Sequence, residues 1–218
     1  MSKDEAKVAA RQNMNALERG ISHLAEIFVP LLPAIIVGGL ILGFRNIIGD
    51  IKMLEGGTKT LVEVSPFWAG AHSFLWLLGE AIFHFLPVGV TWSVVKKMGG
   101  TPILGIVLGI TLVSPQLMNA YAIGQKAPEV WDFGSFVIQK VGYQAQVIPA
   151  ILAGMCLAFI ENKVKKIVPD YLTLVIVPFV ALLTTVLLAH TVIGPVGRAI
   201  GDGVAVVAKA ALTGPFAV

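Results

Sequence analysis

Long apolar segments alternate with shorter polar ones along most of the chain. Apolar residues dominate five segments, at residues 25–44, 74–95, 102–121, 143–160 and 172–193. A helix needs about 20 apolar residues to cross the hydrocarbon core of a bilayer. The pattern therefore predicts an all-α polytopic membrane protein with about five transmembrane helices. The fourth helix is expected to be short or irregular, because the polar "GYQAQ" precedes its apolar part "VIPAILAGMCLAFI".

Both ends of the chain are predicted to form amphipathic helices at the membrane interface. In residues 1–22, apolar positions such as Met14, Leu17 and Ile21 recur at helical spacing, with charged residues between them. A cytoplasmic extension of the first transmembrane helix explains the same pattern. In residues 194–218, Gly-rich turns precede a short stretch of small apolar residues, which predicts an interfacial crossover segment. Residues 23–193 then form the membrane domain.

The composition excludes a soluble globule. Hydrophobic residues make up 56% of the chain and charged residues only 13%, with a mean hydropathy of +0.83, whereas soluble domains average about 25% charged residues. The net charge of +3 is spread between apolar segments, so no basic face for nucleic acid is expected. The sequence contains none of the common catalytic, cofactor-binding or metal-binding motifs. We therefore predict no catalytic residue, cofactor or metal site.

The basic residues predict a cytoplasmic N-terminus. Lys96 and Lys97 follow the second apolar segment, and Lys163, Lys165 and Lys166 follow the fourth. The N-terminal segment carries further lysines and arginines. Cytoplasmic loops of membrane proteins are enriched in Lys and Arg, so these three regions are expected to share the cytoplasmic side.

Five polar residues within or beside the apolar segments are candidates for contacts with a sugar. Gln116 and Asn119 lie three apart in the third segment, which a Ser-Pro pair interrupts, and Tyr143, Gln144 and Gln146 open the fourth. Amides donate and accept hydrogen bonds, which together with an aromatic ring suits a neutral hydroxylated solute. A location at the interface, or hydrogen bonds between helices, explains the same residues without a ligand.

An acidic residue and a histidine lie inside the second segment. Glu80 and His84 are four residues apart, so a helix places them on one face and in reach of each other. Ionisable residues at membrane depth are costly, and they usually face protein or water. A fixed structural pair and a proton path both account for this intramembrane polar pair.

Several stretches resemble a known family. The stretches "KKMGGTPILGIVLG", "GYQAQVIP" and "AHTVIGPVGRAIGDGV" closely resemble the membrane (IIC) component of bacterial phosphotransferase-system sugar permeases, in the glucose superfamily. The resemblance covers nearly the whole chain. Within the superfamily the chain is most similar to trehalose-specific IIBC members, although sucrose, β-glucoside and N-acetylmuramate members are similar too.

The resemblance implies uptake of trehalose, or a related disaccharide, across the bacterial cell (inner) membrane with concomitant phosphorylation. The phosphate would come from a phosphorylated IIB domain, which IIA and HPr phosphocarriers supply. The resemblance also implies a homodimer, in which the first five helices form the dimer-contact domain. The implied partners are therefore the sugar, these phosphocarrier proteins, a second copy and the lipid bilayer, with no nucleic acid.

Two family features match no position of the sequence: the phosphorylated cysteine motif of IIB and the "GVTEPA"-type sugar-binding motif of the second half of IIC. The chain is therefore expected to be the scaffold and dimerisation half of a protein-phosphohistidine–sugar phosphotransferase, without catalytic activity of its own. Two alternatives stay open. One is a proton-coupled secondary sugar carrier with Glu80 and His84 as its relay, and the other is a truncated, non-transporting module that dimerises with the full-length permease.

Overall fold

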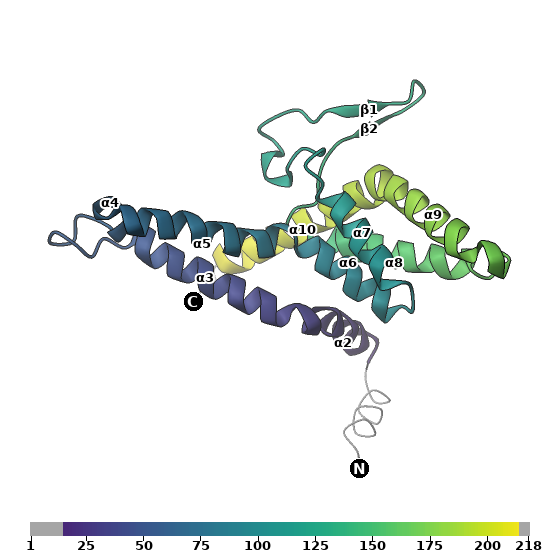
Figure 1. Cartoon of the computed structure of the whole chain (residues 1–218), viewed down its shortest axis with the longest axis horizontal. Helices are drawn as coiled ribbons and strands as arrows, with labels where there is room; N and C mark the ends of the chain where they lie inside the picture. Colours follow the sequence, from purple (N-terminus) through teal and green to yellow (C-terminus); the bar gives the residue numbers. More distant parts are fainter. Residues whose placement is uncertain (1–14, 214–218) are drawn as a thin grey trace, which may run out of the picture.

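The computed structural model describes residues 15–213, so the expectations for residues 1–14 and 214–218 lie outside the described residues. The described chain is helical apart from its loops and one small hairpin, which confirms the all-α prediction. Figure 1 shows a long pair of helices, α3 and α5, extending to one side of a bundle that contains α6, α7, α8 and α9. The elements are α2 (Ala16–Phe28), η1 (Val29–Leu31), α3 (Leu32–Asp50), α4 (Leu61–Val64), α5 (Pro66–His84), α6 (Leu86–Lys97), α7 (Pro102–Leu112), η2 (Ala120–Ala122), β1 (Val130–Asp132), β2 (Val137–Gln139), α8 (Val147–Val164), α9 (Asp170–Leu188), η3 (Ala189–Ile193) and α10 (Gly194–Thr213).

Four helical stretches in the described residues are long and apolar enough to cross a membrane: Gly20–Asp50, Pro66–Lys97, Val147–Val164 and Asp170–Val207. The first stretch includes most of α2, as expected for an extension of the first transmembrane helix. The first stretch is interrupted beside Pro30 and the second beside Pro87. Proline removes a backbone donor and crowds the preceding helical turn. The fourth helix, expected over residues 143–160 as short or irregular, is the 18-residue α8, and the polar residues 143–146 lie outside it.

The prediction of one transmembrane helix over residues 102–121 is wrong. Helix α7 has 11 residues and ends at Leu112. Pro115 has no backbone N–H to donate to Thr111 in a continuing helix. Gln116, which would donate to Leu112, donates to the Ser114 hydroxyl at 3.3 Å, and the Leu112 carbonyl accepts from the N–H of Tyr143 at 2.9 Å. The chain continues through η2 and an antiparallel hairpin of β1 and β2, in which Trp131 pairs with Ile138.

The core lies where α6, α7, α8 and α9 meet, and its closest approach is between α6 and α7. A side chain at Gly105 would place its Cβ 2.8 Å from the backbone oxygen of Thr91, and one at Gly109 would meet the backbone of Val88. The Thr91 hydroxyl donates to the Gly105 carbonyl at 2.7 Å. Small residues allow helices to approach closely in a membrane, where packing replaces the hydrophobic driving force.

Polar contacts hold together one end of the bundle, here called the basic end, which comprises α2 and the ends of α6 and α8. The buried carboxylate of Glu161 accepts from the N–H of Thr101 at 2.9 and 3.0 Å, and an acidic group is favourable at the N-terminus of α7. Lys97 lies 2.8 Å from a carboxylate oxygen of Glu26 and donates to the His23 carbonyl at 2.8 Å. The segments predicted to share the cytoplasmic side therefore lie close together.

The Gly-rich turns predicted after residue 193 are not formed. Helix α10 follows α9 directly through η3, a π-helical turn. Pro195 cannot donate to the carbonyl of the preceding helical turn, and Gly194 bonds back to the Ala189 carbonyl, five residues earlier. Local π-helical turns accommodate an extra residue inside a helix. The glycines of this segment therefore lie on a helix.

Replacing Gly109 with alanine is expected to lower the free energy of unfolding by about 1–3 kcal/mol, because the new methyl group would clash with the backbone of α6. Thermal unfolding of the purified protein in detergent measures the effect. The matched control is Gly70→Ala on α5, where an added Cβ meets nothing within 4 Å. Equal unfolding temperatures for the two variants would contradict this account of α6–α7 packing.

Candidate functional site

The predicted sugar-contacting residues lie on the loop between α7 and α8, residues 113–146, at what is here called the loop end. Figure 1 shows this loop, with β1 and β2, rising above the helices. The loop is fixed to itself by backbone hydrogen bonds: Met118 donates to the Lys140 carbonyl, and Gly142 donates to the Met118 carbonyl, both at 2.8 Å. The last part of the loop therefore re-enters the helix bundle at a defined position.

Tyr143 fixes the last part of this loop to the helix bundle. The side chain is 1% exposed, and its hydroxyl donates to the Ala189 carbonyl at 2.6 Å. A phenol keeps its proton at neutral pH, so the hydroxyl remains a donor. A side chain at Gly194 would clash with this hydroxyl. Tyr143 therefore joins the loop to the junction of α9 and α10.

Two of the predicted amides make hydrogen bonds within the loop itself. The buried Gln144 accepts from the N–H of Ala120 at 2.9 Å. Asn119 accepts from the N–H of Tyr121 at 3.0 Å and caps η2. These amides satisfy backbone donors that have no helical or strand partner.

Gln116 lies on the surface of the loop. It lines a cavity of about 280 Å³ together with Lys126, Glu129 and Lys140, and the last two form an ion pair of 3.1 Å. Gln116 is exposed and lies outside the helix, because α7 ends at Leu112.

Gln146 lines a larger cavity of about 490 Å³ between the start of α8 and the start of α10. Arg198 and Asp202 of α10 line the same cavity. The side-chain oxygen of Gln146 and one terminal nitrogen of Arg198 are buried and have no hydrogen-bond partner among the described residues. The Arg198 guanidinium lies 5.6 Å from the centre of the Tyr143 ring. The cavity thus combines one predicted residue with two that the sequence analysis did not single out.

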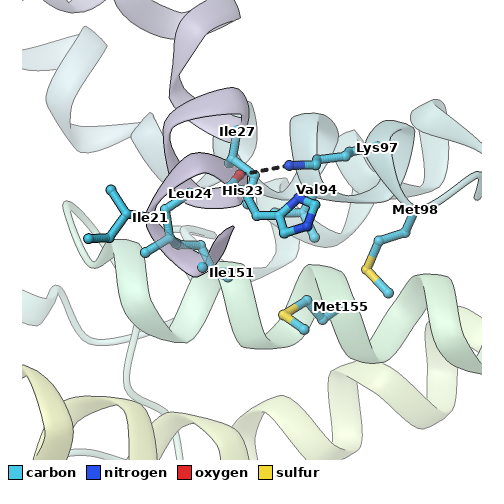
Figure 2. Close-up of a pocket in the computed structure, with 10 residues that line it drawn as sticks. Ile21, His23, Leu24, Ile27, Val94, Lys97, Met98, Ile151 and Met155 are labelled. Carbon is cyan, nitrogen blue, oxygen red and sulfur yellow. Dashed lines mark hydrogen bonds between the residues drawn. The ribbon is translucent and has the colours of Figure 1, made fainter. Parts of the chain in front are cut away.

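A second, apolar cavity of about 700 Å³ lies at the basic end. In Figure 2, Ile21 and Leu24 of α2 and Met155 of α8 surround it, and Lys97 points to the His23 carbonyl. Hydrocarbon side chains make up most of the lining. This cavity suits an apolar group such as a lipid chain better than a sugar, whose hydroxyl groups need hydrogen-bond partners.

The structure brings Glu80 and His84 together on α5. Nδ1 of His84 lies 2.9 Å from Oε1 of Glu80, although the two atoms do not have hydrogen-bond geometry. The histidine ring also packs against the ring of Phe85, with centroids 4.9 Å apart. A structural pair and a proton path both remain predictions for Glu80 and His84.

Four long apolar helical stretches in the described residues define a multi-pass membrane protein. A cavity lined by Gln146, Arg198 and Asp202 lies at its loop end. A family model described as "Phosphotransferase system, EIIC" matches residues 25–214, and the chain belongs to this family. It is accordingly a multi-pass protein of the bacterial inner membrane.

Curated relatives match along nearly the whole chain. The chain is 63% identical over 217 residues to the PTS system trehalose-specific EIIBC component of Escherichia coli (strain K12), a match that covers 100% of this chain and 46% of that protein. It is 42% identical to the protein of the same name from Bacillus subtilis (strain 168), over 92% of this chain and 43% of that protein. It is 38% identical to the sucrose-specific EIIBC component of Pasteurella multocida (strain Pm70), over 93% of this chain and 43% of that protein.

The chain spans about half the length of the curated relatives it matches. No solved structure matches it significantly.

Replacing Tyr143 with phenylalanine is expected to lower the free energy of unfolding by about 1 kcal/mol, the usual net contribution of one hydrogen bond. The change removes only the hydroxyl that donates to the Ala189 carbonyl. Thermal unfolding in detergent gives the stability, with Tyr121→Phe, on an exposed ring, as the control. A Tyr143→Phe protein as stable as this control would show that the hydroxyl does not anchor the loop.

Proposed function

We propose that this chain forms part of a phosphotransferase-system permease that takes up trehalose across the bacterial membrane and phosphorylates it during uptake. The identity of 63% to a protein named trehalose-specific EIIBC component, over the whole chain, carries the proposal. Identity to a relative named sucrose-specific is lower, at 38%. The sugar is therefore trehalose, or a related disaccharide, rather than sucrose.

The two ends of the bundle divide the work in this proposal. With the N-terminus in the cytoplasm, the loop end faces outward and receives the sugar. The basic end then faces the IIB domain, whose phosphocysteine donates the phosphate after IIA and HPr have supplied it. The chain itself acts as scaffold and sugar-facing surface and provides no catalytic residue.

The five predicted sugar-contacting residues take two roles in this proposal. Gln116 and Gln146 contact the sugar, and the unpartnered oxygen of Gln146 in a cavity supports this role. Asn119, Tyr143 and Gln144 hold the loop in place, which their hydrogen bonds to Tyr121, Ala189 and Ala120 support.

The proposed permease works as a homodimer, with α3 as part of the contact between copies. Added Cβ atoms at Gly39 and Gly43 would meet nothing within 4 Å, and Ile36 and Leu40 on the same helix are exposed. Open glycines allow the close helix contacts that drive association in membranes. These observations support a helix-to-helix contact there.

Uptake of labelled trehalose by cells that have the permease containing this chain as their sole trehalose transporter tests the proposal. We expect the label to accumulate as a sugar phosphate, and to be lost when the HPr phosphocarrier is deleted, because phosphate transfer drives the uptake. Sucrose serves as the control sugar.

An uncoupler of the proton gradient separates this proposal from a proton-coupled carrier. Accumulation of unmodified sugar that ignores loss of HPr, collapses with the uncoupler and fails in a Glu80→Gln variant would contradict the proposed function. It would instead assign a proton relay to the Glu80–His84 pair.

A further inference from the structure

Two residues that line the cavity between α8 and α10 each carry a buried polar atom without a hydrogen-bond partner among the described residues. The buried oxygen of Gln146 can only accept, and the buried nitrogen of Arg198 can only donate. Both residues line one cavity of about 490 Å³. Buried polar groups are nearly always hydrogen-bonded, so a ligand that reaches these two groups would both donate and accept hydrogen bonds.

The charges on the wall favour a neutral ligand. Asp202 lies four residues after Arg198 on α10 and lines the same cavity, yet no ion pair joins these two side chains in the described chain. One positive and one negative group offer no net attraction to an anion or a cation. Hydroxyl groups can accept from a guanidinium and donate to a carboxylate or an amide oxygen, and a sugar presents several of them side by side.

The glycines of α10 leave the space that such a ligand needs. At Gly197 a Cβ would lie 2.7 Å from a side-chain carbon of Pro149, so helix packing requires glycine there. At Gly201, which also lines the cavity, an added Cβ would meet nothing within 4 Å. Packing therefore does not account for glycine at Gly201. The volume falls in the range of about 300–1,000 Å³ that is typical of small-molecule sites.

Arg198 is held in place before a ligand arrives. Its guanidinium lies over the ring of Tyr143, which is itself fixed by the bond to the Ala189 carbonyl. A cation over an aromatic face is attracted by the ring. Such preorganisation lowers the entropy that a binding site loses when it takes up its ligand.

We propose that the cavity between α8 and α10 is a recognition site for a neutral disaccharide, in which Arg198 and Asp202 bind sugar hydroxyl groups together with Gln146. The inference rests on the proposed function and deepens it. Arg198 and Asp202 determine how tightly the sugar binds, and they take no part in the transfer of phosphate.

Kinetics of trehalose uptake test the site, in the permease that contains this chain. Arg198→Gln and Asp202→Asn are each expected to raise KM for trehalose by about ten- to a hundredfold, as for the loss of one hydrogen bond to a charged group. The maximal rate and the amount of folded protein in the membrane should change little. Lys52→Gln, an exposed residue in the loop after α3, is the charge-matched control. An unchanged KM in both cavity variants would overturn the proposal.

A labelling experiment keeps the test decisive if either variant folds poorly. Cysteine is placed at Gly201 in a Cys156→Ala background and treated with a small methanethiosulfonate, with and without trehalose. Trehalose should slow labelling at position 201 several-fold, and should leave a Gly203→Cys control unchanged, because Gly203 does not line the cavity. Equal labelling with and without the sugar would overturn the proposal.

Failure of the proposed function and failure of the recognition site give different results. If the unaltered permease does not phosphorylate trehalose, the proposed function fails, whatever the variants do. If the unaltered permease phosphorylates trehalose normally and the cavity variants keep its KM, only the recognition site fails.

Discussion

The position of the loop end depends on the two hydrogen bonds that Tyr143 donates. Its N–H closes the end of α7 at the Leu112 carbonyl, and its hydroxyl reaches the Ala189 carbonyl where α9 becomes α10. Backbone groups at membrane depth must find partners inside the protein, because hydrocarbon offers none. One buried residue, through its backbone N–H and its hydroxyl, therefore connects α7, the returning loop and the junction of α9 and α10.

The cavity at the loop end follows from this connection. Because Tyr143 occupies the space beside Gly194, α10 leaves the π-helical turn close to the start of α8 and packs through Gly197 on Pro149. The basic end is organised differently: Glu161 and Lys97 are both paired there, with Thr101 and Glu26. The cavity at the loop end is therefore lined by two residues with unpartnered polar atoms, Gln146 and Arg198, whereas Glu161 and Lys97 are paired at the basic end.

Hydrophobic patterning predicted the all-α class and four of the spans, because burial in hydrocarbon is a property of whole segments. It failed over residues 113–121, where the helix ends through a bond from Tyr143, far along the chain. The sequence could not predict that the Gln144 amide accepts from a backbone N–H, because an amide forms hydrogen bonds with a backbone group and with a ligand equally well. Arg198 and Asp202 were missed because the glycines around them predicted turns. The available signal was the spacing of Gly194, Gly197 and Gly201, which places all three on one side of a helix.

The most direct test of the central claim is an experimental structure of the permease that contains this chain, determined with trehalose bound. The account predicts density for the sugar between α8 and α10, within hydrogen-bond distance of Arg198, Asp202 and Gln146. Density for the sugar at a site that touches none of these residues, with the cavity filled by protein side chains, would contradict it.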